Sequence, residues 1–209
     1  MLCHYAWHNV DMKPIHVILA SASPRRAEML KDLSIPFKLF VPRVSEKLNK
    51  NASTRKTATD LAIKKCKKYK GVNSLVIGMD TIVAVNKMKL GKPENQEDAK
   101  GMLKLLNGRT HEVITGVALK WKGRLVTGTA TTRVQFRKMK PHEIEWYVQT
   151  GEPFDKAGAY AIQGLGRIFI ERIEGCYYNV VGFPLTLFQS LLLRFGLTIQ
   201  DLQRFPRNR

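Results

Sequence analysis

The segment SASPRR, which begins at Ser21, carries the most informative chemistry in this sequence. Ser23 and Pro24 are residue types that begin a helix, because Ser caps it and Pro at the first helical position loses no hydrogen bond. A helix N-terminus offers unpaired N–H groups to an anion, and Ser21 and Ser23 add hydroxyl groups. Arg25 and Arg26 carry planar guanidinium groups that match two phosphate oxygens. The segment predicts a phosphate site; an ordinary capped helix with solvated arginines is the alternative.

Two carboxylates stand where a phosphate-binding enzyme needs them. Glu46 follows the second expected strand, and Asp80 ends the apolar run VIGMD. A buried acid must be paired, metal-bound or catalytic, although an Asp at a strand end is also a common turn former. Mg²⁺ or Mn²⁺ takes oxygen ligands and bridges substrate phosphates, so one or two carboxylates suffice. We therefore expect Glu46 and Asp80 to hold a divalent cation.

Three polar side chains later in the chain fit the same anion. They are Lys92 in GKP and Lys156 and Gln163 in FDKAGAYAIQG. A triphosphate carries about four negative charges, which spaced lysines neutralise. Each segment alone is also typical of an ordinary surface loop. Three anion-compatible segments in one chain favour a triphosphate site, and it is not a Walker loop, because G-x-x-x-x-G-K-[ST] is absent from the sequence.

Hydrophobic periodicity places these residues on alternating strands and helices. The apolar runs 16–20, 74–80 with its continuation TIVAV, and 168–173 predict strands, and residues 111–136 predict a hairpin that turns at Lys122-Gly123. Apolar spacing and capping residues predict helices from Ser23, over 57–69, 97–108 and 141–151, and from Pro184. Without internal repeats or a low-complexity linker, the chain reads as one continuous α/β domain over residues 13–209.

Composition narrows the class of protein. With 209 residues and 44% hydrophobic content, the chain can build a real core. The sequence shows neither an apolar run of about 20 residues nor a signal peptide, so we expect a cytoplasmic protein with no membrane partner. Its 35 Lys and Arg against 17 Asp and Glu give a net charge of +18, which attracts nucleic acid, an anionic surface or a phosphate-rich small substrate. The densest basic run, KKCKKYK over 64–70, is interpreted mainly as a solvated helix face.

The N-terminus and the cysteines add little chemistry. We expect residues 1–12 to be a flexible extension, with Met12 as an alternative start. Cys3, His4 and His8 lack the second ligand pair of a structural zinc site. The three cysteines of the chain are scattered and odd in number, which argues against a disulfide framework.

The order of these motifs resembles the Maf family of nucleotide pyrophosphatases. The resemblance covers residues 15–195 and is carried by LASASPRR, VSE, LAIKKC, GMDTIV, GKP, LLNGRTHEVITGV, DKAGAYAIQG and GCYYNVVGFPL. It implies an elongated, two-lobed α/β fold related to the inosine-triphosphate pyrophosphatases, with a central cleft and a twisted mixed sheet. It also implies hydrolysis of a nucleoside triphosphate between its α and β phosphates. Many members have an acidic pair where this chain has Ser45 before Glu46.

The resemblance also assigns roles to residues. It makes Asp80 the catalytic carboxylate and turns Glu46 and Lys65 toward the cleft. Within the family, Arg25, Thr81 and Gln163 resemble the subgroup that prefers dTTP and UTP, and a side-chain amide can read a pyrimidine edge. The remaining substrate-binding residues that it implies are Ser21, Arg26, Lys92 and Lys156.

The mechanism expected from the sequence is metal-dependent hydrolysis at the α-phosphorus. Asp80 or a metal-bound water supplies the nucleophile, and pyrophosphate leaves. A preference for 7-methyl-GTP or another modified nucleotide is the alternative within the same fold. A basic nucleic-acid-binding protein is the alternative of another class, although the sequence shows no recognisable motif for it. Nucleic acid is thus a compatible but unnecessary partner, and a homodimer is compatible with the sequence.

Overall fold

The computed structural model describes residues 14–49 and 51–203, so the expected extension 1–12, with Cys3, His4 and His8, lies outside the described residues. The strands are β1 (His16–Ala20), β2 (Phe37–Phe40), β3 (Ser74–Val85), β4 (Met88–Leu90), β5 (Thr110–Trp121), β6 (Arg124–Phe136) and β7 (Ile170–Glu174). The α-helices are α1 (Pro24–Asp32), α2 (Thr54–Lys68), α3 (Gln96–Leu106), α4 (Pro141–Gln149), α5 (Tyr177–Val181) and α6 (Leu185–Leu193). Short 3-10 helices are η1 (Glu152–Asp155), η2 (Ala157–Ala159) and η3 (Leu165–Phe169).

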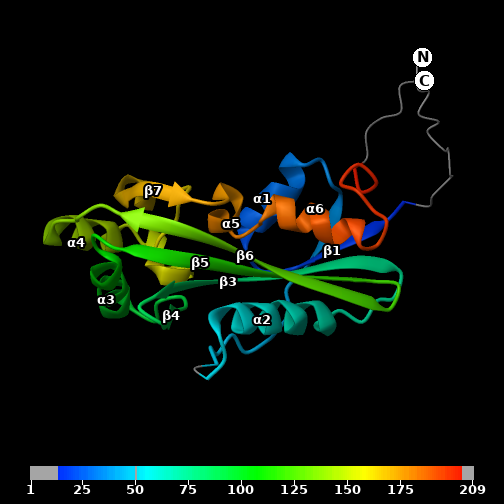
Figure 1. Ribbon diagram of the computed structural model, residues 1–209, viewed down its shortest axis with the longest axis horizontal. Coiled ribbons are helices and arrows are strands. Elements are labelled where there is room, and N and C mark those ends of the chain that lie inside the picture. Colours follow the sequence, from blue (N-terminus) through cyan, green and yellow to red (C-terminus); the bar gives the residue numbers. More distant parts are fainter. Residues whose placement is uncertain (1–13, 50, 204–209) are drawn as a thin grey trace, which may run out of the picture.

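The strands of the described residues form one mixed sheet in the order β2-β1-β3-β5-β6-β7, with β4 paired to β3. β1 runs parallel to β2 and β3, and the other pairs are antiparallel. Long strands β3, β5 and β6 run through the whole length of the molecule and give it an elongated shape (Figure 1). The predicted α/β class with a mixed sheet is confirmed.

Most predicted elements are confirmed, and five details differ. The strand predicted over 168–173 begins only at Ile170, because residues 165–169 form the 3-10 helix η3. α2 begins one turn earlier, because the Ser53 side chain accepts a hydrogen bond from the Lys56 N–H. Pro184 is the N-cap of α6 and not its first residue. Ser23 is the N-cap of α1, but its side chain makes no cap hydrogen bond. Asp80 does not end a strand: β3 continues to Val85, so Asp80 lies in its middle and the turn-former alternative is wrong.

Helices cover both faces of the sheet. α2 lies on one face, α1, α5 and α6 lie on the other, and α3 and α4 pack at one end (Figure 1). The buried residues form separate clusters that follow this division: one joins α1 and α6 to the sheet, and another joins α3, α4 and η3 to its far end. Among the described residues, no helix is both long and apolar enough to cross a membrane.

Two glycines allow α2 to lie directly on the backbone of the sheet. A Cβ atom on Gly78 would lie 2.5 Å from the carbonyl oxygen of Ala62, and one on Gly116 would lie 2.4 Å from that of Ala58. Both distances are far shorter than a van der Waals contact, so a side chain at either position would push the helix away. This close packing determines how near the polar side chains of α2 come to β3.

His111 is a buried histidine of β5, beside the rings of Phe136 and Tyr160. Its Nε2 and the hydroxyl of Tyr160 are 2.8 Å apart, and its Nδ1 has no hydrogen-bond partner in the described part of the chain. Burial lowers the pKa of His111 to about 4. Neutral His111 is therefore the form that the native core accepts.

This burial predicts an acid-sensitive stability. The ordinary pKa of histidine is about 6.5, so between that pH and pH 4 the unfolded chain binds a proton that the native state does not. The contribution is thus complete above about pH 6.5 and is lost as the pH falls. We expect wild type to lose about 2 kcal/mol more unfolding free energy than His111→Gln between pH 7 and pH 5, measured by urea unfolding. Equal losses in both proteins would contradict the assignment.

Candidate active site

A gap in the sheet exposes the middle of β3. Its pairing with β1 ends at Gly78, and its pairing with β4 begins at Val83. The edge of residues 79–82 is therefore left without a neighbouring strand, and the carboxyl end of β1 lies beside it. Crevices at the carboxyl ends of parallel strands are the usual ligand sites of open α/β sheets.

A cavity of about 550 Å³ opens at this gap. Successive side chains of a strand point to opposite faces of the sheet. Because this edge of β3 has no neighbouring strand, side chains of both faces border the cavity, and Asp80 and Thr81 both line it. The volume is within the range of small-molecule sites. The predicted site residues that line it are Ser21, Ser23, Arg25, Arg26, Glu46, Lys65, Asp80, Thr81, Lys92 and Lys156.

Lys65 joins the two predicted acidic residues. Its Nζ lies 2.6 Å from Oδ1 of Asp80 and 2.6 Å from Oε1 of Glu46. Lys65 and Asp80 are buried, whereas the Glu46 side chain is 43% exposed. Asp80 belongs to the face of β3 on which Gly78 contacts α2, and this contact brings Lys65 within reach. Charges drawn out of water in this way need such pairing.

The environment separates the two carboxylates in acidity. Burial raises the pKa of Asp80 above its ordinary value, although the positive charge of Lys65 acts against it. Burial also acts to raise the pKa of Glu46, but the hydrogen bond and charge of Lys65 and the charge of Lys92 outweigh it, and the pKa falls. Both acids share the ammonium group of Lys65, and only at the more buried Asp80 does burial outweigh its effect on the pKa. Two acids whose pKa values are pushed apart are typical of a catalytic site.

Arg26 is turned toward the protein. Its Nε donates to the Gly182 carbonyl at 2.9 Å, its Nη1 to Ser21 Oγ at 3.1 Å and to the Met79 carbonyl at 3.0 Å, and its Nη2 to Thr81 Oγ1 at 3.0 Å. These bonds use four of its five N–H groups. Arg26 therefore closes the unpaired edge of β3 and keeps at most one N–H for a phosphate.

Arg25 projects in the other direction, across the cavity. Its Nη1 lies 3.4 Å from Oδ2 of Asp155, which also pairs with Lys156. Sequence reasoning missed Asp155, although it directly precedes Lys156 in the matching motif DKAGAYAIQG. Its place beside Lys156 in that motif was the signal available in the sequence. Asp155 holds Arg25 and Lys156 at the cavity, where a phosphate could take its place.

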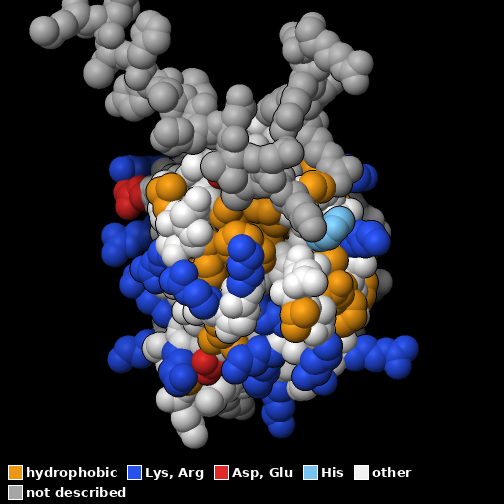
Figure 2. All heavy atoms as spheres, turned by 90° about the vertical axis from the view of Figure 1, so that its right-hand side faces the viewer, with side chains coloured by type: hydrophobic (Ala, Val, Ile, Leu, Met, Phe, Trp, Pro, Cys, Tyr) orange, Lys and Arg blue, Asp and Glu red, His pale blue; other side chains and the backbone are white. Residues whose placement is uncertain are grey.

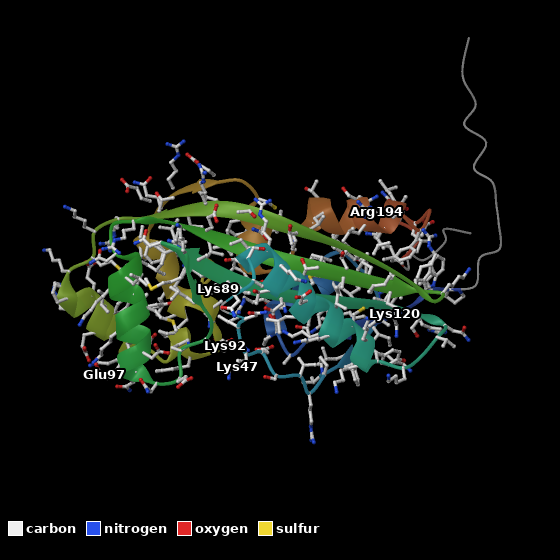
Figure 3. All side chains as sticks on the ribbon, turned by 60° about the horizontal axis from the view of Figure 1, so that its bottom comes forward. Lys47, Lys89, Lys92, Glu97, Lys120 and Arg194 are labelled. Atoms are coloured by element: carbon white, nitrogen blue, oxygen red, sulfur yellow. The ribbon has the colours of Figure 1, made fainter. Side chains whose placement is uncertain are left out.

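The remaining predicted residues fall into two groups. Lys92 is half exposed and its Nζ lies 3.3 Å from Oε2 of Glu46 (Figure 3). Ser23 donates its backbone N–H to Ser21 Oγ at 3.1 Å. Gln163, in contrast, is exposed and is not among the cavity-lining residues, so the structure does not bring it together with the others.

The donor set fits a hard divalent cation that is shared with a substrate. Within residues 14–49 and 51–203, no three His, Cys, Asp or Glu side chains cluster as a ready metal cage. Glu46 and Asp80 supply two carboxylates at the cavity, and Lys65 neutralises them meanwhile. Mg²⁺ typically binds with one or two carboxylates and completes its shell with water and phosphate oxygens.

Sequence comparison assigns the family. A family profile described as Maf-like protein matches residues 16–195. The chain belongs to the Maf family. Its known relatives include a dTTP/UTP pyrophosphatase of Desulforamulus reducens, 46% identical over 192 residues that cover 90% of this chain and 100% of that protein. A dTTP/UTP pyrophosphatase of Bacillus cereus is 44% identical over 185 residues, which cover 88% of this chain and 97% of that protein.

Two solved structures share part of the backbone arrangement of this Maf protein. The Ham1 protein of Staphylococcus aureus has a TM-score of 0.45 and 15% identity, and the match covers 74% of this chain and 79% of that chain. A HAM1 protein from Coxiella burnetii has a TM-score of 0.46 and 14% identity, and the match covers 75% of this chain and 80% of that chain.

Proposed function

We propose that this protein hydrolyses a nucleoside triphosphate, dTTP or UTP, to the monophosphate and pyrophosphate. The observation that carries the proposal is the pair Asp80 and Glu46, joined by Lys65 in the cavity beside the N-terminus of α1. Acids for the chemistry and cations for the phosphates lie together there. The Maf relatives at 46% and 44% identity, both named dTTP/UTP pyrophosphatase, support the reaction and the substrate.

The residues divide the work by their geometry. Arg25, Lys92 and Lys156 face the cavity from three elements and spread the negative charge of the triphosphate. The N–H groups at the start of α1 add a local positive potential. Arg26 and Thr81 hold the edge of β3, so that Asp80 keeps a fixed position. On substrate binding, Asp155 releases Arg25 to the phosphates.

Asp80 acts as the general base. A carboxylate with a raised pKa takes a proton from water more readily than an ordinary one. The water oxygen bonds to the α-phosphorus, the bond between that phosphorus and the bridging oxygen breaks, and pyrophosphate leaves. Glu46 and Asp80 are the residues that would hold Mg²⁺ or Mn²⁺, which when bound neutralises phosphate charge and polarises the reacting phosphate.

The products test the reaction type. With dTTP or UTP and Mg²⁺, we expect monophosphate and pyrophosphate in equal amounts, because the acids and cations are proposed to act at the α-phosphorus. Separation of the nucleotides with an assay for pyrophosphate measures both products. Orthophosphate as the primary product would show attack at the γ-phosphorus and would contradict the proposal.

Base selection by Gln163 is a separate proposal that rests on the family resemblance. Gln163 reaches the base only if the segment over 161–166 moves when the substrate binds. Loss of its amide in Gln163→Ala should then leave polar groups unpaired and weaken discrimination by about 1–3 kcal/mol. The measurement is the kcat/KM ratio of dTTP over GTP and over 7-methyl-GTP.

The exposed position of Gln163 favours the alternative result, in which Gln163→Ala does not change base selection. An unchanged ratio in Gln163→Ala would show that other residues of the cavity select the base. A uniform loss on all substrates would report damage and not selection. Preference of the wild type for 7-methyl-GTP would place the protein in the other substrate subgroup, with the same reaction.

A further inference from the structure

One end of the molecule gathers cations that the proposed reaction does not use. The C-terminus of α2, the turn between β5 and β6, and the C-terminus of α6 meet there. Lys120 Nζ donates to the Tyr69 carbonyl at 2.5 Å, and Arg124 Nη2 donates to the Arg194 carbonyl at 3.3 Å. The rings of Trp121 and Phe195 pack edge to face, 5.9 Å apart. We call the six cations that these elements present the basic end surface: Lys68, Lys70, Lys120, Lys122, Arg124 and Arg194.

Acids are absent from the parts of the chain that meet at this end. Residues 61–75, 118–127 and 187–200 contain no Asp or Glu, and the first acid after the last of these segments is Asp201. Figure 2 looks straight at this end, and Lys and Arg side chains dominate the face over the few acidic ones. Six of the 35 Lys and Arg residues of the chain are thus gathered at this end, on segments that carry no acid. Such a field attracts polyanions over several ångströms.

The cations of the basic end surface are not engaged by acids of the protein. All except the half-buried Lys120 are exposed, and none forms an ion pair with a carboxylate of the described residues. In contrast, four of the six cations that line the cavity have acidic partners, namely Arg25, Lys65, Lys92 and Lys156. Unpaired cations at this end therefore repel one another until an external anion arrives.

Two of these cations pack against aromatic rings. Lys122 Nζ lies 4.4 Å from the centre of the Trp121 ring, and the Arg124 guanidinium lies 5.4 Å from that of Phe195. The turn itself is tight, with positive φ at Lys122 and Gly123. Fixed cations suit a partner whose phosphates are regularly spaced, because little side-chain entropy is lost on binding. A fluid lipid surface has no regular phosphate spacing, so the placement of these cations favours its binding less.

The aromatic residues favour a duplex over a single strand. Proteins that bind single strands stack bases on open aromatic faces. Here Trp121 and Phe195 are half buried, pack on each other and carry a cation each. We propose that the basic end surface binds the phosphate backbone of a nucleic-acid duplex, without regard to its sequence, as a second binding function separate from the nucleotide cavity.

The two sites are far enough apart to be tested independently. Figure 3 shows Lys47 and Lys92 near the middle of the molecule and Lys120 and Arg194 at one end. None of the six cations lines the cavity. A change at the end surface should therefore leave nucleotide hydrolysis unaltered.

The test is the binding of the full chain to a fluorescent 20-base-pair duplex, followed by anisotropy at several salt concentrations. We expect the logarithm of the affinity to fall linearly with the logarithm of the salt concentration. Lys122→Glu with Arg124→Glu should weaken binding at 100 mM salt by at least about tenfold and reduce the slope by about two, because two phosphate contacts are lost. Unchanged affinity in this double variant overturns the proposal.

A matched control makes the same charge change at the other end. Lys138 and Lys140 are exposed and precede α4, so Lys138→Glu with Lys140→Glu should alter affinity by less than about twofold, since distant charges are screened. Equal losses in both double variants would mean a general charge effect. Displacement of the duplex by excess dTTP would place binding in the cavity instead.

A third arm separates a membrane from a nucleic acid. Val72 and Leu193 are the exposed apolar residues of this end, at 72% and 57% exposure. Sedimentation with phosphatidylserine vesicles that is lost in Val72→Ser with Leu193→Ser, together with no duplex binding, would identify a lipid surface and overturn the proposal. Duplex binding that survives in this variant supports it.

Discussion

Asp80→Asn is expected to lower kcat for dTTP by about a hundredfold or more, while the protein stays folded. The amide has nearly the shape of the carboxylate but cannot take a proton from water. Lys65 keeps its contact with Glu46, so the variant does not leave a buried ammonium without a partner. Steady-state hydrolysis measures the loss, and thermal unfolding checks the fold.

Asp98→Asn is the matched control for this experiment. Asp98 also lines the cavity, but its carboxylate accepts the Glu94 N–H at 3.0 Å and makes no contact with Lys65. The same loss of one negative charge there should change kcat by much less. Near-normal turnover in a folded Asp80→Asn protein would remove Asp80 from the mechanism.

Arg25 and Arg26 are adjacent, yet their replacement is expected to damage different properties. Arg26→Met should lower the unfolding free energy by about 3–5 kcal/mol, because it removes a buried charge with four hydrogen bonds and leaves the carbonyls of Met79 and Gly182 unpaired. Arg25→Met removes only a half-exposed ion pair with Asp155, so stability should change by at most about 1 kcal/mol.

The loss of activity per molecule of folded protein should be larger in Arg25→Met than in Arg26→Met. Arg25→Met should raise KM for dTTP by at least about tenfold, since it loses a direct charge contact with the phosphates. Urea unfolding and steady-state kinetics on both variants separate the two roles. If Arg26→Met proves as stable as wild type, the assignment of Arg26 to the edge of β3 is wrong.

The cytoplasmic location, the homodimer and the domain bounds 13–209 stay predictions. The metal requirement is tested by hydrolysis after removal of divalent cations and their return.

The sequence by itself determined the elements and the kinds of chemistry. Period-two and helical patterns predicted β1, β3, the β5–β6 hairpin and α1–α4 in broad outline, because these patterns reflect which side of each element meets the core. Turn chemistry located Lys122-Gly123 correctly. The motif order identified the family, and the sequence named most of the cations that line the cavity but only two of its five acids, because it missed Glu94, Asp98 and Asp155.

The tertiary structure alone decided how these side chains work. Nothing local distinguishes Arg25 from Arg26, because the difference comes from the carbonyl oxygens of Met79 and Gly182, which lie far away in the chain. In the sequence, Lys65 is one lysine of a basic run. It reaches Asp80 because Gly78 allows α2 to pack closely on β3. Asp80 lines the cavity, although it is buried, because β1 stops and β4 starts on either side of it, and the pairing of distant strands sets that gap. Exposure of Gln163 follows from the path of the chain over 161–166, which no spacing rule encodes.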